Sequence, residues 1–285
     1  MNRKKQNIID AAYTLFIGNG YNSTSIQDIL DEAGISKGTF YNYFTSKSEC
    51  LIAIMESIGN EIRQKRMESA SGRPVNDPEV LAEQLCIRIR MNREKNLFSL
   101  YESIFYSQDK ELKDFAKHSY RIELDWITSR IVDIYGQKAA PYALDNAATV
   151  HGTIQQLVNI WQLTTEEDLP TEKLAAFVIK RLETAVLAQI ESGERFIQAP
   201  TVYTEKSSAN LSVAELAQQL ENYSEKILDD APSRQLVLFL SQELLAETPR
   251  QALLESVLGT LSKNPELKSE LMILLEQVWK KLAAL

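Results

Sequence analysis

The sequence is poor in residues that break helices and in residues that hold metals or form disulfides. Its 285 residues include ten glycines, eight prolines, two cysteines and two histidines. So few glycines and prolines, with almost no alternation of polar and apolar residues, predict an all-α chain. Cys50 and Cys86 are too few and too far apart in sequence for a disulfide framework or a zinc site. We therefore expect buried, reduced thiols, as in a cytoplasmic protein.

The groups that commonly carry catalysis are scarce as well. His118 and His151 each stand alone in their segments, without a partner at metal-ligand spacing. The sequence shows neither a glycine-rich phosphate loop nor a nucleophile elbow. We predict no catalytic residues, no metal and no cofactor, so an enzyme is the least favoured class. There is no run of about 18 apolar residues and no signal peptide, which predicts a cytoplasmic protein that does not enter a membrane.

Charge is spread unevenly along the chain. The formal net charge is −8, but residues 1–66 hold eight Lys/Arg against seven Asp/Glu, which gives +1 there and −9 in the remainder. No acidic residue lies between positions 33 and 48, which suits a surface that approaches phosphates. Because the positive charge is weak, affinity for a nucleic acid would need two copies of such a surface.

The most informative stretch covers residues 23–47, STSIQDILDEAGISKGTFYNYFTSK. Ser25 and Asp28 have the spacing of a capping box in front of an apolar set, which predicts the start of a helix. Gly34 tolerates the left-handed conformation that ends a helix. Ser36 can cap a second helix directly afterwards. The pattern predicts two short helices joined by a tight turn.

The second of these helices carries an unusual set of side chains. Phe40 and Phe44 form a buried pair at i, i+4 spacing, and the rest of the surface consists of donors and small residues. In a helix-turn-helix, the second helix enters the major groove. Gly38 would permit close approach, Thr39 and Asn42 could reach base edges, and phosphates would be contacted by Lys37, Tyr41, Tyr43 and Lys47. The plainer interpretation is a helical hairpin with half-exposed tyrosines.

These residues resemble the TetR-type family of transcriptional regulators. SKGTFYNYFTSK beside TSIQDILDEAG is similar to that family's N-terminal signature. The preceding segment fits too, because Ile8, Ala12, Leu15 and Phe16 form one apolar stripe. The resemblance implies a tri-helical head with Phe40 and Phe44 in its core. The positions that it implies to face DNA are Thr24, Ser25, Lys37, Gly38, Thr39, Tyr41, Asn42, Tyr43 and Lys47.

Further helices are predicted after the motif. Apolar spacing and capping residues predict helices at about 46–67, 78–92, 95–106, 109–135, 141–163 and 171–192. The last two are apolar over a wide arc, which is typical of an interior helix or one paired with a second chain. The family resemblance, which extends to about residue 197, implies a homodimer formed through helices 141–163 and 171–192.

Residues 198–285 exceed the usual length of that family. A polar linker, 198–210, precedes four further leucine-rich helices. Their predicted starts are Ser212 with Glu215, Asp230 or Ala231 before Pro232, Thr248-Pro249 with Gln251, and Asn264-Pro265. We expect a small helical bundle that packs on the core or extends the dimer contact; the alternative is a docking surface for another protein. The predicted domains are a head (1–50), an effector-binding and dimerisation core (51–197) and a C-terminal extension (198–285).

The core helices also mix aromatic and polar residues, as an effector pocket would. For each residue alone, the plainer interpretation is an ordinary core aromatic or surface polar group. Arg121 would suit an acidic or phosphate-bearing effector, whereas a lipophilic effector would be lined by Phe105, Tyr106, Trp126 and Trp161. The candidate ligand-binding residues are Tyr101, Phe105, Tyr106, His118, Arg121, Trp126, His151, Gln155 and Trp161.

The sequence thus favours a homodimeric, ligand-responsive repressor. Its two heads would bind a near-palindromic operator in double-stranded DNA, and a small-molecule effector of unknown identity would release them. The alternative is a DNA-anchored interaction module whose C-terminal extension binds another protein.

Overall fold

The computed structural model describes residues 3–197, 211–226, 231–264 and 267–282. All regular elements in these ranges are helical, which confirms the predicted all-α fold with a tri-helical head, a helical core and a small C-terminal bundle. The predicted linker 198–210 and the predicted helix-start residues Asp230 and Pro265 lie outside the described residues. No helix in the described ranges is long and apolar enough to cross a lipid bilayer.

The head consists of α1 (Arg3–Asn19), α2 (Ile26–Ala33) and α3 (Lys37–Tyr41). Ile8, Ala12 and Phe16 of α1 are buried against Ile29 of α2 and Phe40 of α3. The same hydrophobic cluster continues into the first half of α4 and into α6 and α7. The head is therefore packed directly on the helix that follows it.

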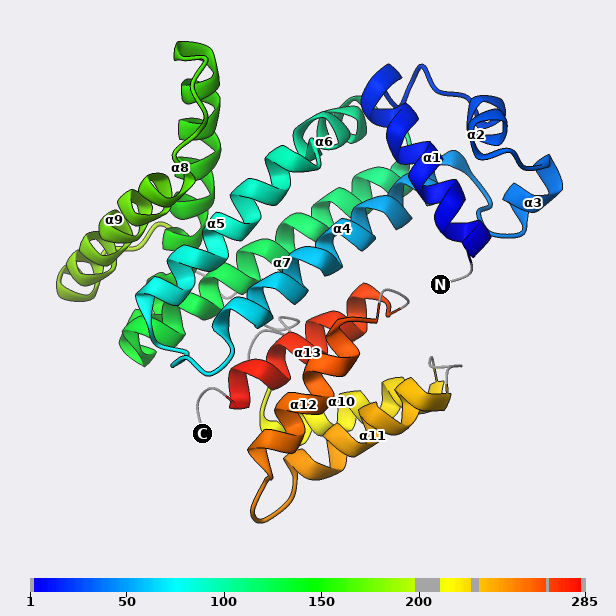
Figure 1. Cartoon of the computed structure of the whole chain (residues 1–285). Helices are drawn as coiled ribbons and strands as arrows, with labels where there is room; N and C mark the ends of the chain where they lie inside the picture. Colours follow the sequence, from blue (N-terminus) through cyan, green and yellow to red (C-terminus); the bar gives the residue numbers. More distant parts are fainter. Residues whose placement is uncertain (1–2, 198–210, 227–230, 265–266, 283–285) are drawn as a thin grey trace.

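Helix α4 (Lys47–Ala70) runs from the head along the core, beside α5 (Pro78–Glu94) and α7 (Lys110–Tyr135) (Figure 1). Ser46 caps its start, because the Ser46 hydroxyl accepts a hydrogen bond from the Glu49 amide at 3.0 Å; the Glu49 carboxylate accepts from the Thr45 amide instead of completing a capping box with Ser46. The short helix α6 (Leu97–Tyr106) connects α5 to α7 and contacts α1. Helix α4 is thus the one continuous element that joins the head to the core.

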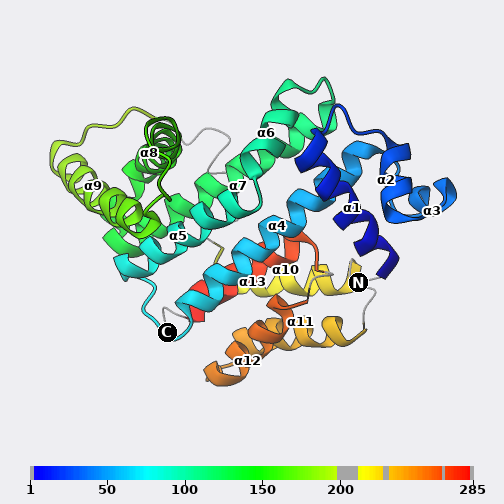
Figure 2. The same cartoon turned by 45° about the horizontal axis from the view of Figure 1, so that its top comes forward.

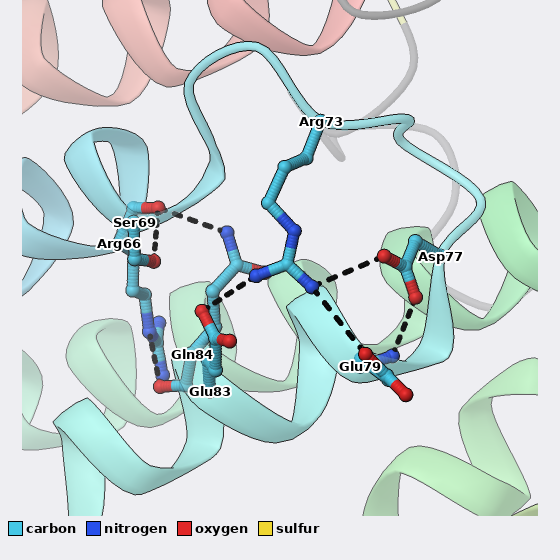
Figure 3. Close-up of polar contacts among 7 residues, drawn as sticks. All are labelled: Arg66, Ser69, Arg73, Asp77, Glu79, Glu83 and Gln84. Atoms are coloured by element: carbon cyan, nitrogen blue, oxygen red, sulfur yellow. Dashed lines mark hydrogen bonds and ion pairs between the residues drawn. The ribbon is translucent and has the colours of Figure 1, made fainter.

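The connection between α4 and α5 is held by an arginine that faces several carboxylates (Figure 3). The Arg73 guanidinium lies 3.1 Å from Asp77 and 2.7 Å from Glu83. Asp77 also caps α5 by accepting from the Glu79 amide at 2.8 Å. These contacts hold the turn after α4 against the start of α5.

Helices α8 (Ala143–Thr164) and α9 (Thr171–Ser192) follow a 3-10 turn, η1 (Gln137–Tyr142). They pack on each other and on α5 and α7 around a cluster that includes Ala147, Val178 and Leu182. Figures 1 and 2 show that these two helices and the head lie at opposite ends of the layer formed by α4, α5 and α7. The far end of the molecule is therefore formed by the two helices predicted to dimerise.

The C-terminal bundle consists of α10 (Val213–Lys226), α11 (Ala231–Leu244), α12 (Gln251–Ser262) and α13 (Ser269–Leu282). It packs on the core through α13, which lies along α4 in both views (Figures 1 and 2). Met67 and Ala70 of α4 belong to the bundle's own hydrophobic cluster. This arrangement agrees with the expectation of a bundle that packs on the core.

A buried polar contact also ties α13 to the core. The Lys280 ammonium lies 3.0 Å from the Asp133 carboxylate of α7 and donates a hydrogen bond to the Ser129 hydroxyl. Asp133 also accepts from the fully buried Arg130, at 3.0 Å. Breaking a buried pair is costly because one charge is left uncompensated. The contact therefore fixes where α13 lies.

One of the predicted helix starts in the extension is wrong. Helix α12 begins at Gln251 rather than at Thr248-Pro249. The start predicted at Asn264-Pro265 falls partly outside the described residues, and α13 begins at Ser269. Before α12, the Glu243 carboxylate of α11 accepts from the Arg250 amide at 2.8 Å and from its guanidinium at 2.6 Å. This tertiary contact determines where α12 starts. The Ser212–Glu215 capping box is confirmed, with the Glu215 amide donating to the Ser212 hydroxyl at 3.2 Å.

Candidate nucleic-acid interface and core cavity

Helix α2 has both ends fixed by residues that the sequence predicted. The Ser25 hydroxyl accepts from the Asp28 amide at 3.1 Å, and the Asp28 carboxylate accepts from the Ser25 amide at 2.7 Å. Hydrogen bonds from the Ser25 amide and hydroxyl lower the pKa of Asp28. Gly34 ends the helix with a φ of 61°, a left-handed conformation that suits glycine. The Asn7 side chain of α1 donates to the Ala33 carbonyl at 2.8 Å, which holds α2 on α1.

Helix α3 is short and is held by two buried rings. Ser36 caps it by accepting from the Thr39 amide at 3.2 Å. Phe40 and Phe44 are both buried, with ring centroids 5.8 Å apart. The helix itself ends at Tyr41, so Phe44 lies in the turn that follows. The buried pair fixes one side of α3 and leaves the other side facing outward.

The outward side of α3 consists of six of the predicted DNA-facing residues. Lys37, Gly38, Tyr41 and Asn42 are exposed, and Thr39 and Tyr43 are half-buried. A Cβ atom at Gly38 would meet nothing nearer than the Ser36 hydroxyl, 3.9 Å away. The fold itself therefore does not require glycine at position 38. Ser25 is also exposed at the start of α2, although its hydroxyl is engaged in the capping box.

Two of the predicted DNA-facing residues are placed differently from expectation. Thr24 is only 1% exposed, and its hydroxyl donates to the Gly20 carbonyl at 2.9 Å. The Lys47 ammonium donates to the carbonyls of Tyr21 and Thr24, both at 2.7 Å, and lies 4.2 Å from the centroid of the Tyr21 ring. Burial lowers the pKa of Lys47. In this structure both side chains hold the α1–α2 connection, because the turn leaves buried carbonyls that need donors.

A second feature is a cavity of about 190 Å³ between the core and the C-terminal bundle. Its walls come from α4, α5, α6, α7 and α13. Three predicted ligand-binding residues line it: Tyr101, His118 and Trp126. The cavity is smaller than the roughly 300–1,000 Å³ of typical sites for drug-sized ligands. The space fits a small ligand.

Other predicted ligand-binding residues do not line this cavity. Arg121 lies 3.9 Å from Asp125 on the same helix. His151 packs edge-on against Tyr120 at 5.0 Å, and burial lowers its pKa. Gln155 is exposed on α8, and the Trp161 ring N–H donates to the Glu167 carbonyl at 2.9 Å. His151 is not on the lining, but it lies within electrostatic reach of Glu123 and Arg88, which are. The side chains of Phe105 and Tyr106 lie outside the described residues.

Charged residues of the cavity were missed at the sequence level. Arg66 is 2% exposed, and its guanidinium makes two hydrogen bonds to the Glu123 carboxylate, at 2.6 and 3.2 Å. Arg88 lies 3.9 Å from the same carboxylate. Burial by itself would raise the pKa of Glu123, but Arg66 and Arg88 outweigh burial and hold this pKa at about 2. Each of these residues alone has the sequence pattern of a surface charge, so no local signal identifies it.

The fold and the exposed face of α3 define a helix-turn-helix DNA-binding regulator. Residues 8–54 match the family model described as "Bacterial regulatory proteins, tetR family". The head of the chain therefore carries the helix-turn-helix of this family of transcriptional regulators.

Two relatives in Bacillus subtilis (strain 168) carry descriptions of the same kind. The "Uncharacterized HTH-type transcriptional regulator YerO" is 27% identical over 288 residues, which cover 97% of each chain. The "Uncharacterized HTH-type transcriptional regulator YuxN" is 27% identical over 73% of this chain and 70% of its own. A crystal structure of a transcriptional regulator (TerR/AcrR family) from Aquifex aeolicus VF5 is similar at a TM-score of 0.47, with 20% identity over 65% of this chain and 98% of that one. The similarity to YerO runs through most of the C-terminal extension.

Proposed function

We propose that the protein is a homodimeric repressor that binds a near-palindromic operator in cytoplasmic DNA. The observation that carries this proposal is the exposed face of α3. It presents Lys37, Thr39, Tyr41 and Asn42 beside a glycine that the fold does not require. Lysine and tyrosine donate to phosphates, while threonine and asparagine can read base edges. Space above Gly38 would let the backbone approach the duplex.

Dimerisation through α8 and α9 is supported by apolar residues that the single chain leaves exposed. Leu163 is 85% exposed, Leu187 54% and Phe177 40%. Large exposed apolar residues that gather on one face are typical of an interaction surface. A second copy that covers this face would place two heads on one duplex. The two heads would then read two matched half-sites about 34–36 Å apart, and the sequence specificity of the dimer would exceed that of one head.

The core cavity supports the proposal that a small-molecule effector releases the operator. Met55, Ile62 and Arg66 of α4 line the cavity, and α4 is continuous with the head. A ligand that favours one position of α4 would change the separation of the two heads. A coupling of about 1–3 kcal/mol would change operator affinity by about 5- to 150-fold.

The alternative is an interaction module in which the bundle binds another protein. Its α13 is buried against the core, and residues such as Leu245 and Leu253 remain exposed. No specific observation on this remaining surface identifies a partner. The repressor is therefore the better supported function.

The test is operator binding by the double variant Thr39→Ala with Tyr41→Ala. An operator is first selected from random duplexes with the wild-type protein, and affinities are then measured by fluorescence anisotropy. We expect a loss of at least tenfold, because each good base or phosphate contact contributes about 1–3 kcal/mol. The matched control is Thr260→Ala with Tyr120→Ala, which removes an exposed threonine and an exposed tyrosine outside the head. Unchanged binding by the head variant would refute the proposed interface.

A further inference from the structure

The C-terminal bundle supplies one wall of the core cavity. Ser269, Glu270, Ile273 and Glu276 of α13 line it, opposite residues of α4 and α7. Their spacing places them on one face of α13. The Asn60 side chain of α4 donates to the Leu267 carbonyl at 3.0 Å, just before α13 begins. The cavity is thus bounded jointly by two parts of the chain that are about 200 residues apart in sequence.

Two buried polar atoms on the cavity walls have no hydrogen-bond partner among the described residues. One is Oε1 of Glu276, a residue that is 5% exposed, and the other is the ring N–H of Trp126, which is 6% exposed. Buried polar groups in folded proteins are nearly always hydrogen-bonded, so such exceptions need an explanation. Burial also raises the pKa of the Glu276 carboxyl. A bound ligand that donates to Glu276 would relieve the cost of burying this carboxylate.

The charges around the cavity favour a cation as this ligand. Arg66 and Arg88 are already drawn to Glu123, at 2.6 and 3.9 Å. Glu56 of α4 and Glu270 of α13 are exposed residues on the lining and add two further carboxylates to it.

Arg63 is the remaining positive charge on the lining. Its guanidinium donates to the Asn60 side chain at 3.0 Å, and among the described residues no ion pair within 4.0 Å joins it to Glu276. Arg63, Arg66 and Lys280 all act on the Glu276 carboxyl, but on the cavity lining outside the cluster of Arg66, Arg88 and Glu123 there are three carboxylates and one arginine. An anion would have to compete with Glu123, whereas a cation would find acceptors available.

We propose that the core and α13 together form a site for a small organic cation, an amidinium or a protonated amine, whose N–H groups donate to Glu276. The apolar part of the ligand would lie against Leu97, Phe115 and Ile273, which also line the cavity. The cavity volume of about 190 Å³ restricts the ligand to roughly one ring. This proposal names the effector class within the proposed function, but direct binding tests it without DNA.

The experiment compares three probes of nearly equal shape by isothermal titration with the full chain. Benzamidine is a cation, benzamide is its neutral counterpart and benzoate is its anionic counterpart. We expect benzamidine to bind at least tenfold more tightly than benzamide, and benzoate not to bind. Glu276→Gln should weaken benzamidine binding by about tenfold to a hundredfold, because a charged hydrogen bond becomes a neutral one. Glu225→Gln, at an exposed position on α10, is the matched control and should bind as wild type does.

Several results would overturn this assignment. They are benzoate binding as tightly as benzamidine, unchanged benzamidine binding in Glu276→Gln, or no benzamidine binding at about 10 mM. Circular dichroism checks that each variant is folded. If Glu276→Gln does not fold, Glu276→Asp replaces it: this variant keeps the charge, so it should still prefer benzamidine to benzoate, and loss of this preference would count against the site.

Operator binding in the presence of benzamidine separates the two proposals. If benzamidine binds through Glu276 but does not release the operator, the proposed cation site is supported and the proposed release of the operator by an effector is contradicted. Release that does not depend on Glu276 would support the repressor and contradict this site.

Discussion

Glu123→Gln is the substitution whose effect on stability follows most directly from the structure. Glu123 and Arg66 form a buried pair with two hydrogen bonds, at 2.6 and 3.2 Å, that joins α4 to α7. The Arg66 guanidinium also stacks on the Trp126 ring, 3.5 Å from its centroid. Glutamine keeps the shape of the side chain but removes the charge. Arg66 and Arg88 would then face each other across a neutral group.

Two lines of reasoning give a similar magnitude for this change. The pKa of Glu123 falls from 4.5 to about 2 in the folded protein, and at about 1.4 kcal/mol for each pKa unit this corresponds to about 3 kcal/mol. Removing one partner of a buried ion pair costs about 3–5 kcal/mol. We therefore expect the free energy of unfolding to fall by about 3 kcal/mol. The melting temperature should fall by roughly 6–10 °C.

The assay is thermal unfolding followed by circular dichroism at 222 nm, at one protein concentration because a dimer unfolds in a concentration-dependent way. Glu94→Gln, at an exposed position on α5, is the control and should change stability by less than about 0.5 kcal/mol. The double variant Arg66→Met with Glu123→Leu should be more stable than Glu123→Gln, because it leaves no buried unpaired charge. A melting temperature of Glu123→Gln within about 2 °C of wild type would refute the reasoning.

The same pair predicts a dependence on pH. Because the pKa of Glu123 is lowered on folding, its contribution to stability is fully present above about pH 4.5 and is lost as the pH falls towards about 2. The difference in melting temperature between wild type and Glu123→Gln should therefore be largest near neutral pH and shrink below pH 4.5. A difference that stayed constant down to about pH 2.5 would show that Glu123 does not act through its charge.

Two further predictions concern the head and the dimer. Lys37→Ala should lower the slope of log affinity against log salt by about 1 for each head, because an exposed lysine at a phosphate is lost. Lys47→Ala should instead lower the melting temperature and leave this slope unchanged, since its ammonium is bound to two carbonyls at 2.7 Å; equal slopes for the two variants would contradict the assignment. Leu163→Glu should yield monomers in analytical ultracentrifugation, because a buried unpaired charge opposes association. The control Leu245→Glu, on the bundle, should remain dimeric, and the reverse outcome would move the dimer contact to the bundle.

Much of the head could be predicted because its signals are local. The capping residues Ser25, Ser36 and Ser46 each bond to an amide three residues away, so the sequence alone specifies those helix starts. The burial of Phe40 and Phe44 was also predicted from the sequence, although Phe44 lies in the turn after α3 rather than in the helix. Once the buried residues of this segment are predicted, the remaining residues of α3 are predicted to face outward.

Other features depended on side-chain contacts that helix capping and periodicity do not record. The family resemblance implied that Thr24 faces DNA, but the α1–α2 turn buries it against the carbonyls of Leu15 and Gly20. The start of α12 is set by Glu243, seven residues before Arg250. In both cases a side chain bonds to a backbone group four to nine residues away.

The core cavity shows most clearly the difference between what local sequence predicts and what packing decides. From the sequence, Arg66, Glu123 and Glu276 are three charges on three amphipathic helices, and each would be expected in solvent. The packing of α13 along α4 and α7 brings them to one cavity, where burial makes a partner necessary. The sequence by itself therefore determined the helices and the DNA-binding class, because capping and periodicity act within a few residues. Only the tertiary structure decided which charges meet, because desolvation depends on the surfaces that pack around a group.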